Sequence, residues 1–216
     1  MQSSNGLLKF SVDRTFGFSS TIEAAQNAIR CAKTEATCNQ PNGIGIVKLF
    51  GRSAGYIAAF ATLGSLDVDL CLIPEVPVVL DGPDGCLSHI YNRVKKNKSA
   101  VIVVAEGAGK DLMDLTADTP SIGEFMKESV EKFFEKKGEV ATVKYIDPSY
   151  MIRSAPANAA DSIYSMQLAQ NAVHGAMAGY SGFSIGLLNN KVAMLPIERL
   201  VETSPTKIRG GGKSTT

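Results

Sequence analysis

The chain has 216 residues and 44% hydrophobic side chains, enough to bury a sizeable core in one large or two small domains. Lysine and arginine number 22 and aspartate and glutamate 21, so the formal net charge is +1, and no run of one sign marks a nucleic-acid or anionic-membrane surface. No apolar stretch approaches the length that spans a bilayer, and the first residues lack the layout of a signal peptide. We therefore expect a globular, cytoplasmic protein that binds neither nucleic acid nor membranes.

The cysteines and histidines do not indicate a metal centre. The cysteines are Cys31, Cys38, Cys71 and Cys86. They show no CxxC spacing, and neither histidine has a partner at metal-ligand spacing. The sequence therefore predicts reduced thiols in an intracellular protein, without disulfides and without a metal site.

Helical and strand-like patterns alternate along the first 146 residues. A helix is expected from about Ser20 to Ala36, because apolar residues recur at helical spacing behind the capping-box pair Ser20 and Glu23. Strands are expected at 44–50, 67–74, 100–105 and 140–146, and helices at 54–63, 86–98 and 121–137. Near-continuous apolar strands alternating with helices predict an α/β fold, a parallel sheet with helices on both faces.

The remainder of the chain follows a different pattern. A turn is expected at the letters DPSY, followed by a long helix rich in small residues over 157–178. The letters FSIGLLNNKVAMLPI indicate a hairpin closed at Asn189-Asn190. The final letters KIRGGGKSTT are polar and glycine-rich, which favours disorder.

Two short matches to a phosphate-binding loop fail on spacing. Such a loop requires a glycine five residues before its Gly-Lys-Ser/Thr, because the intervening amides wrap the phosphates. Gly212-Lys213 has Lys207 at that place, and Gly109-Lys110 has Val104. Both matches are interpreted as chance.

Polar and glycine residues stand where the predicted strands end, which is where open α/β sheets bind ligands. Phe50-Gly51-Arg52 follows the first strand, and Glu106 follows the letters AVIVVA. The glycine permits close approach of a ligand, the arginine offers a planar fork of donors, and the carboxylate accepts hydrogen bonds from sugar hydroxyls. Taken alone, Phe50-Gly51-Arg52 is better explained as a strand–helix turn with a solvated arginine, whereas Glu106 fits a helix-entry residue facing water and a sugar-binding carboxylate equally well.

A third group of polar residues accompanies the last strand of the predicted sheet. Lys144, Tyr150 and Arg153 lie within ten residues of one another around the Pro148 turn. Ammonium, phenol and guanidinium groups on one segment can enclose a phosphate dianion. The alternative is again an ordinary surface, because basic residues are common near strand ends.

Six segments, in this order, resemble the second half of ATP-dependent 6-phosphofructokinase, of the group found in plants and some protists. They read SVDRTFGFSSTIEAA, GIGIVKLFGRSAGYIA, DVDLCLIPEVP, AVIVVAEGAGKDL, KYIDPSYMIR and PANAADSIYSMQLAQNAVHGAMAGYSGF. The resemblance covers roughly Ser11 to Pro196, and an ordered set of segments is far more specific than one short motif. It implies a phosphofructokinase-like fold that lacks the N-terminal nucleotide-binding part.

The resemblance also implies roles for the polar residues at the strand ends. The family's usual Met-Gly-Arg segment contacts fructose 6-phosphate and matches Phe50-Gly51-Arg52, with phenylalanine in place of methionine. Glu106 matches the carboxylate that holds the sugar hydroxyls. Tyr150 and Arg153 match the pair that grips the 6-phosphate, and Lys144 lies where a further cation is expected.

The family's catalytic base has no counterpart in this chain. In the family an aspartate of a Thr-Ile-Asp-Asn-Asp motif takes the proton from the sugar's 1-hydroxyl, and its place falls near Gly6, where no carboxylate is found. Asp13 resembles a later, structural aspartate. The loops that resemble the family's ATP and Mg²⁺ site also lie upstream. No catalytic residue is therefore expected here, and the polypeptide is expected to be incomplete.

For the complete enzyme, the resemblance implies phosphorylation of fructose 6-phosphate to fructose 1,6-bisphosphate with Mg²⁺ and ATP in glycolysis, by a homo-oligomer. The isolated chain is expected to be inactive and to carry the acceptor-sugar half of the site. Two alternatives stay open: a non-catalytic sugar-phosphate-binding or regulatory module, and a pyrophosphate-dependent phosphofructokinase.

Four regions follow from this interpretation. Residues 1–14 form a divergent N-terminal segment, and 15–153 form the sugar-phosphate-binding α/β domain. Residues 154–197 form a helix and hairpin that return to the nucleotide-binding domain, and 198–216 form a polar, disordered tail.

Overall fold

The computed structural model describes residues 12–112 and 121–203, and within these ranges the chain forms two compact units. The larger unit spans residues 21–155, and the smaller unit combines residues up to Ser20 with those from Pro156 onward. The elements of the larger unit are α1 (Phe18–Cys38), β1 (Gly43–Leu49), α2 (Tyr56–Ser65), β2 (Leu70–Leu72), α3 (Cys86–Asn97), β3 (Ser99–Ala105), the short 3-10 helix η1 (Lys110–Leu112), α4 (Ile122–Lys136), β4 (Thr142–Ile146) and α5 (Ser149–Arg153). The smaller unit contains the first residues of α1 together with α6 (Ala159–Met177), β5 (Phe183–Leu188), β6 (Lys191–Pro196) and α7 (Ile197–Thr203).

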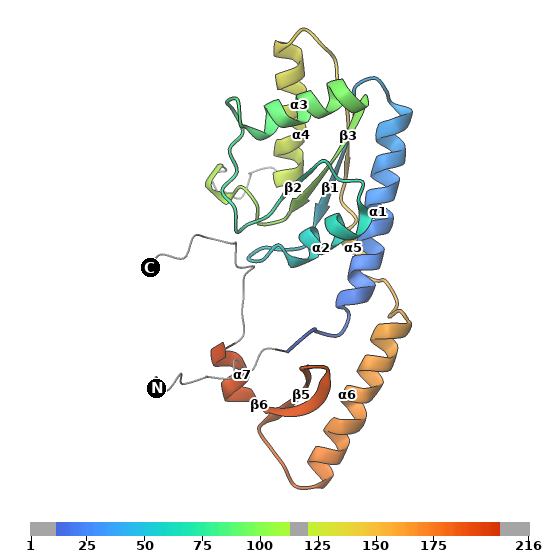
Figure 1. Ribbon diagram of the computed structural model, residues 1–216, viewed down its shortest axis with the longest axis vertical. Coiled ribbons are helices and arrows are strands. Elements are labelled where there is room, and N and C mark those ends of the chain that lie inside the picture. The colour runs from blue at the N-terminus through green and yellow to red at the C-terminus, as the bar shows by residue number, and fades with distance from the viewer. Residues whose placement is uncertain (1–11, 113–120, 204–216) are drawn as a thin grey trace, which may run out of the picture. The chain divides into compact units, whose positions relative to one another are not determined.

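The sheet of the larger unit is parallel throughout, with the strand order β2-β3-β1-β4 (Figure 1). Gly43 at the start of β1 pairs with Ser99 on β3 and with Thr142 on β4, so these three strands start level. Leu49 at the end of β1 pairs with Ala105. The segments that leave β3, β1 and β4 therefore emerge side by side at one edge of the sheet.

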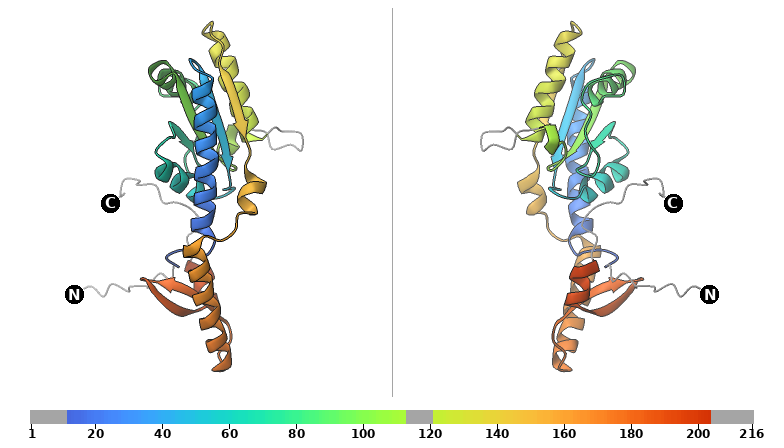
Figure 2. Two further views of the ribbon diagram at one scale, coloured as in Figure 1. Left: turned by 90° about the vertical axis from the view of Figure 1, so that its right-hand side faces the viewer. Right: turned by 90° about the vertical axis from the view of Figure 1, so that its left-hand side faces the viewer.

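Helices cover both faces of this sheet, as the alternating apolar strands predicted. In β3, Ala100, Ile102 and Val104 pack in a core with α3 and α4, whereas Val101, Val103 and Ala105 pack in a second core with α1 and α2. Figure 2 shows α1 running along the sheet. All seven residues of β3 are buried, which is why its sequence is continuously apolar rather than alternating. The predicted α/β class is confirmed.

Small residues bring α1 unusually close to β1. Ala32 and Ala36 of α1 are fully buried. A Cβ atom added to Gly45 would lie 2.7 Å from the backbone oxygen of Ala32, and one added to Gly43 would lie 2.0 Å from that of Ala36. Any side chain at these two strand positions would push the helix off the sheet.

The start of α1 differs from the predicted capping box. The helix begins at Phe18, and Ser20 lies inside its first turn. The Ser20 hydroxyl donates to Oδ2 of Asp161 over 2.6 Å, and its backbone N–H donates to the same oxygen over 2.7 Å. The prediction of a Ser20–Glu23 box was wrong because a buried carboxylate from α6, distant in sequence, is the stronger acceptor for these donors.

The predicted hairpin of the smaller unit is confirmed. β5 and β6 are antiparallel, and Asn189 and Asn190 connect them with φ values of 50° and 63°. This left-handed pair is typical of a two-residue turn that matches strand twist. Asp13 accepts the backbone N–H groups of Asn189 and Asn190 at 3.1 and 2.7 Å. These contacts stabilise the turn, in keeping with the structural part expected of Asp13.

Two elements are shorter or more ordered than expected. β2 covers three residues, Leu70–Leu72, instead of 67–74. It begins directly after Asp69, whose carboxylate accepts from the backbone N–H of Val101 at 3.0 Å and from Arg93. The segment expected as the turn DPSY opens the short helix α5, with Asp147 accepting from the backbone N–H of Ser149 at 3.1 Å.

The four cysteines are free thiols, as expected. Within the described ranges, no helix is both long and apolar enough to cross a membrane. Residues 198–203, expected to begin a disordered tail, form most of α7 instead, so that part of the prediction was wrong. The remainder of the tail from residue 204, the place of the family's base at Gly6 and the Gly212-Lys213 match lie outside the described residues.

Candidate functional site

The site lies where β3, β1 and β4 end. Phe50, Gly51 and Arg52 follow β1, Glu106 follows β3, and α5, which carries Tyr150 and Arg153, follows β4 by two residues. Because these strands are adjacent and parallel, polar residues from three separate stretches of sequence share one edge of the sheet.

Arg52 and Glu106 form an ion pair at the centre of this edge. Nε of Arg52 donates to Oε1 of Glu106 over 2.8 Å, and the exposed fractions of the two side chains are 80% and 30%. The hydrogen bond to Glu106 raises the pKa of Arg52, so the guanidinium keeps its charge at any physiological pH. The pair uses one of five guanidinium N–H donors, which leaves a fork of donors beside a carboxylate acceptor.

Backbone contacts fix the two loops that carry this pair. The N–H of Glu106 donates to the carbonyl of Leu49, and the N–H of Gly107 donates to the carbonyl of Gly51, each over 2.9 Å. A Cβ atom on Gly107 would lie 2.0 Å from the backbone oxygen of Arg52, so only glycine allows this approach. Gly51 has a φ of 138°, a conformation that other residues rarely adopt.

Arg153 is held to the same edge by Phe50. Its guanidinium carbon lies 4.9 Å from the centroid of the Phe50 ring, within the range of a cation–π contact. Phe50 therefore contributes a ring that positions a cation. Tyr150 lies one helical turn before Arg153, and 84% of its surface is exposed.

The sequence reasoning missed an ion pair beneath α5. Nζ of Lys48, on β1, lies 2.6 Å from Oδ2 of Asp147, and the side chains are 16% and 37% exposed. Burial opposes the charge on Lys48, but the hydrogen bond to Asp147 outweighs it and raises the pKa of Lys48 overall. For Asp147, burial is likewise outweighed by Lys48 and Ser149, so its pKa is lowered. The sequence feature that indicates this ion pair is a lysine inside an otherwise apolar strand.

Lys144 does not lie with Arg52 and Arg153 beyond the ends of the strands. It stands in the middle of β4, where it pairs with Gly45, and its Nζ is 3.9 Å from Oε1 of Glu35 on α1. The expectation that it joins the end of the strand is corrected, because the ladder places it in the interior of β4.

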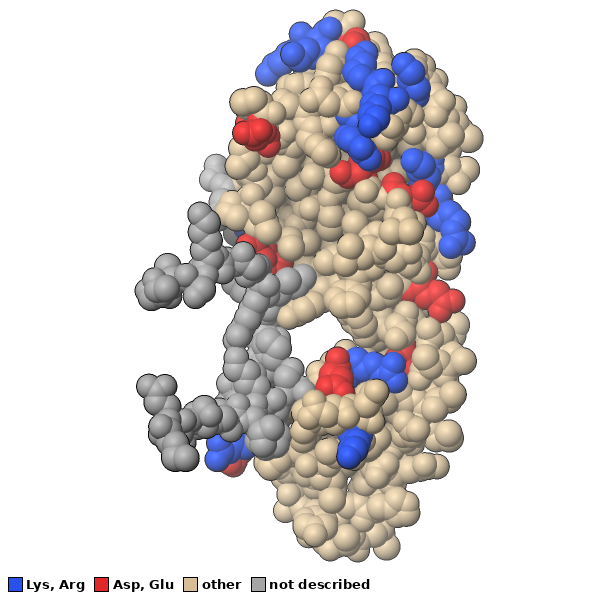
Figure 3. Space-filling view, viewed as in Figure 1, with Lys and Arg blue, Asp and Glu red and all other residues tan. Residues whose placement is uncertain are grey.

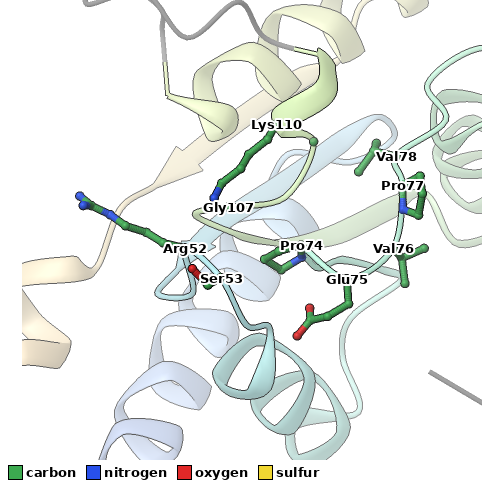
Figure 4. Close-up of a pocket in the computed structure, with 10 residues that line it drawn as sticks. Arg52, Ser53, Pro74, Glu75, Val76, Pro77, Val78, Gly107 and Lys110 are labelled. Carbon is green, nitrogen blue, oxygen red and sulfur yellow. The ribbon is translucent and has the colours of Figure 1, made fainter. Parts of the chain in front are cut away.

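A pocket of about 240 Å³ opens beside Arg52 (Figure 4). It is lined by Arg52, Ser53, Pro74, Glu75, Val76, Pro77, Val78, Gly107, Gly109 and Lys110. These residues come from the segments after β1, β2 and β3, so the pocket continues the same edge of the sheet toward β2.

The described residues contain no group of three histidine, cysteine, aspartate or glutamate side chains that could hold a metal ion. On the face shown in Figure 3, lysine and arginine side chains gather where α3 and α4 lie, with acidic side chains among them.

Comparison with known proteins identifies the family. The family model "Phosphofructokinase" matches residues 10–176. ATP-dependent 6-phosphofructokinase 7 of Arabidopsis thaliana is 48% identical over 203 residues, covering 89% of this chain and 42% of that protein. ATP-dependent 6-phosphofructokinase 1 of the same plant is 46% identical over 204 residues, with 88% and 43% covered.

A solved structure of phosphofructokinase from Saccharomyces cerevisiae superposes with a TM-score of 0.68 at 21% identity, covering 90% of this chain and 24% of that one. This similarity confirms the fold. The chain spans less than half the length of these relatives. With 167 consecutive residues matched by the family model and close relatives along most of its length, the chain belongs to the phosphofructokinase family.

Proposed function

We propose that this chain supplies the fructose 6-phosphate half of a phosphofructokinase active site. The observation that carries the proposal is the convergence of groups from three strands at one sheet edge. Arg52 and Glu106 are 2.8 Å apart, and Arg153 lies over Phe50, which adjoins Gly51 and Arg52. A hexose monophosphate carries hydroxyls at one end and a dianion at the other, which matches a donor–acceptor pair flanked by a further cation.

Each residue has a distinct part in binding the sugar. The Glu106 carboxylate accepts hydrogen bonds from sugar hydroxyls, and the remaining N–H donors of Arg52 bind their oxygens. The 6-phosphate binds the Arg153 guanidinium and the exposed Tyr150 hydroxyl. Gly51 and Phe50 bring backbone and an apolar surface close to the ring, and Phe50 also orients Arg153.

The complete reaction transfers a phosphoryl group from ATP to fructose 6-phosphate, and magnesium neutralises the transferring charge when it is bound with ATP. The names of the two Arabidopsis relatives support ATP rather than pyrophosphate as donor. We propose that these 216 residues alone bind the acceptor without turnover, because the position near Gly6 that matches the family's base carries no carboxylate.

Helix α6 of the smaller unit carries exposed apolar side chains, which favour contact with another part of the enzyme. On α6 the apolar residues Ile163, Met166, Val173 and Met177 are between 54% and 84% exposed. Exposed apolar surface of this kind favours burial against another protein surface. We propose that this helix and the following hairpin pack on a nucleotide-binding domain of the same enzyme, in a cytoplasmic homo-oligomer.

Calorimetric titration of the purified chain with fructose 6-phosphate tests the acceptor site. Arg153→Ala and Glu106→Gln are each expected to weaken binding by about tenfold or more, because each removes a charged hydrogen-bond partner. Arg30→Ala, an exposed arginine on α1, is the matched control and is expected to leave binding unchanged.

A coupled assay with Mg²⁺ and ATP tests the second half of the proposal. No fructose 1,6-bisphosphate is expected from this chain alone. Failure of the unaltered chain to bind fructose 6-phosphate would contradict the acceptor site, and turnover would contradict the proposal that the chain binds without catalysis.

A further inference from the structure

The short helix α5, which carries Tyr150 and Arg153, is not stable by itself. It has five residues, about one helical turn, and helices this short form only where outside contacts hold them. Its N-cap residue, Pro148, makes no side-chain capping hydrogen bond, and of its five residues, all of which the structure describes, only Ile152 is buried. The position of Arg153 therefore depends on what fixes α5 to the rest of the larger unit.

Packing holds α5 mainly at Ile152. This side chain belongs to the core that α1 and α2 form on their face of the sheet. Beside it, residues of α1 together with Pro148, Met151 and Ile152 line a pocket of about 210 Å³. Atoms that border such a space lack neighbours on one side and lose attractive contacts. Packing against α1 alone therefore fixes the helix weakly.

The Lys48–Asp147 ion pair joins α5 to the end of β1. The ladder between β1 and β4 ends one residue before both, so Lys48 and Asp147 are the next residues on neighbouring strands. Oδ2 of Asp147 lies 2.6 Å from Nζ of Lys48, and Oδ1 accepts the backbone N–H of Ser149, the first residue of α5, at 3.1 Å. One carboxylate therefore connects the end of β1 with the start of α5.

Partial burial makes this pair stronger than a pair on the open surface. The Lys48 and Asp147 side chains are 16% and 37% exposed, whereas those of the Lys132–Glu128 pair on α4 are 68% and 59% exposed. Water and salt screen a partly buried pair less, and exposed pairs contribute little. Loss of the Lys48–Asp147 pair is therefore expected to free α5, whereas loss of the Lys132–Glu128 pair is expected to change little.

We propose that Lys48 and Asp147 are positioning residues of the acceptor site: their ion pair holds the start of α5 at the end of β1 and so keeps Arg153 in place for the 6-phosphate. The proposal rests on the proposed function, which assigns Arg153 to that phosphate. Neither residue of the pair contacts the sugar. Once the pair is broken, α5 moves more freely, and the Arg153 guanidinium leaves its place over the Phe50 ring.

The sign of the effect of Asp147→Asn on fructose 6-phosphate binding tests this inference. Asparagine still accepts the N–H of Ser149 but loses the ion pair with Lys48. We expect calorimetric titration to show binding weakened by about tenfold, and Lys48→Met to give a similar loss. Charge alone predicts the opposite sign for Asp147→Asn, because removal of a negative charge favours a phosphate dianion. Lys132→Met, which breaks the exposed pair on α4, is the matched control, with an expected change below about twofold.

Two further measurements show whether the pair acts through α5. The backbone N–H of Ile152 donates to the carbonyl of Pro148 over 2.9 Å, and its hydrogen exchange is expected to be about tenfold faster in Asp147→Asn. On an Arg153→Ala background, Asp147→Asn is expected to weaken sugar binding by less than about a further twofold, since the residue that the pair positions is already absent. A loss that adds in full to that of Arg153→Ala would refute the positioning role.

The outcomes separate the two proposals. An unaltered chain that does not bind fructose 6-phosphate contradicts the acceptor site, and this role of the pair with it. If the unaltered chain binds the sugar, unchanged or tighter binding by Asp147→Asn refutes the positioning role while the acceptor site stands. Unchanged hydrogen exchange at Ile152 also refutes it, and so does a loss of affinity in Lys132→Met equal to that in Lys48→Met.

Discussion

The helices α1 and α6 are both long and rich in alanine, yet they meet different surroundings. In α1, of 21 residues, a stripe of alanines packs on β1, where glycine stands opposite. In α6, of 19 residues, only Asp161, Tyr164 and Gly175 are buried, and its apolar side chains are largely exposed. Small residues on a helix permit a partner to pack closely against it. They do not identify which segment is that partner.

The largest expected effect comes from filling the contact between α1 and β1. Gly45→Val is expected to lower the free energy of unfolding by about 3 kcal/mol, because its Cβ atom collides with the backbone of Ala32. Ala169→Val on the exposed surface of α6 is the matched control, with an expected change below about 0.7 kcal/mol. Urea unfolding followed by circular dichroism measures both. Equal changes in the two variants would contradict the close packing of α1.

An intermediate effect is expected where a residue of α6 binds the start of α1. Asp161→Asn is expected to cost about 2 kcal/mol at pH 7, because the variant leaves the Ser20 donors without a charged acceptor. Urea unfolding at neutral pH measures the loss, and Ser162→Ala, at an exposed neighbouring position, is the control.

The same pair gives a pH dependence with a defined sign. Burial raises the pKa of Asp161, but the hydrogen bonds from Ser20 outweigh it, so the folded-state pKa lies below the unfolded value. The stabilisation is therefore fully present above an unfolded pKa of about 3.9 and is lost as the pH falls through the folded-state pKa. The stability difference between the unaltered chain and Asp161→Asn should shrink in that acid range. A constant difference would mean that charge is not its source.

The smallest effect is expected on the open side of α6. Val173→Lys is expected to change the free energy of unfolding by less than about 0.5 kcal/mol, since the valine is 61% exposed and buries little surface. The same urea experiment measures it. A loss as large as that of Gly45→Val would show that this side of α6 is covered in solution, which would remove the contrast with α1.

The strands and helices of the larger unit could be predicted closely because the hydrophobic residues of each element follow the pattern typical of that element. β3 is continuously apolar and buried on both faces, and α3 and α4 each have one apolar side. Prediction failed where a distant side chain replaced a local partner. Ser20 donates to Asp161 rather than joining a capping box, and β2 begins only after Asp69, whose carboxylate accepts from Val101.

The candidate site divides in the same way. The sequence indicated Arg52, Glu106 and Arg153, because each is a polar residue that follows an apolar segment with the pattern of a strand. The Lys48–Asp147 pair and the contact of Phe50 with Arg153 could not be predicted, since they depend on which strands are neighbours and on side-chain direction. Lys144 was misplaced because one residue's position within a strand depends on the register of pairing.

By itself, the sequence determined the α/β class, the family and the residue types at the strand ends, since these depend on local periodicity and on ordered segments of letters. Only the tertiary structure decided that β1 lies between β3 and β4, and therefore that Arg52 meets Glu106, that Phe50 meets Arg153 and that Arg52 and Lys110 line one pocket. Strand order is fixed by packing between segments far apart in the chain, and no local pattern records which segments those are.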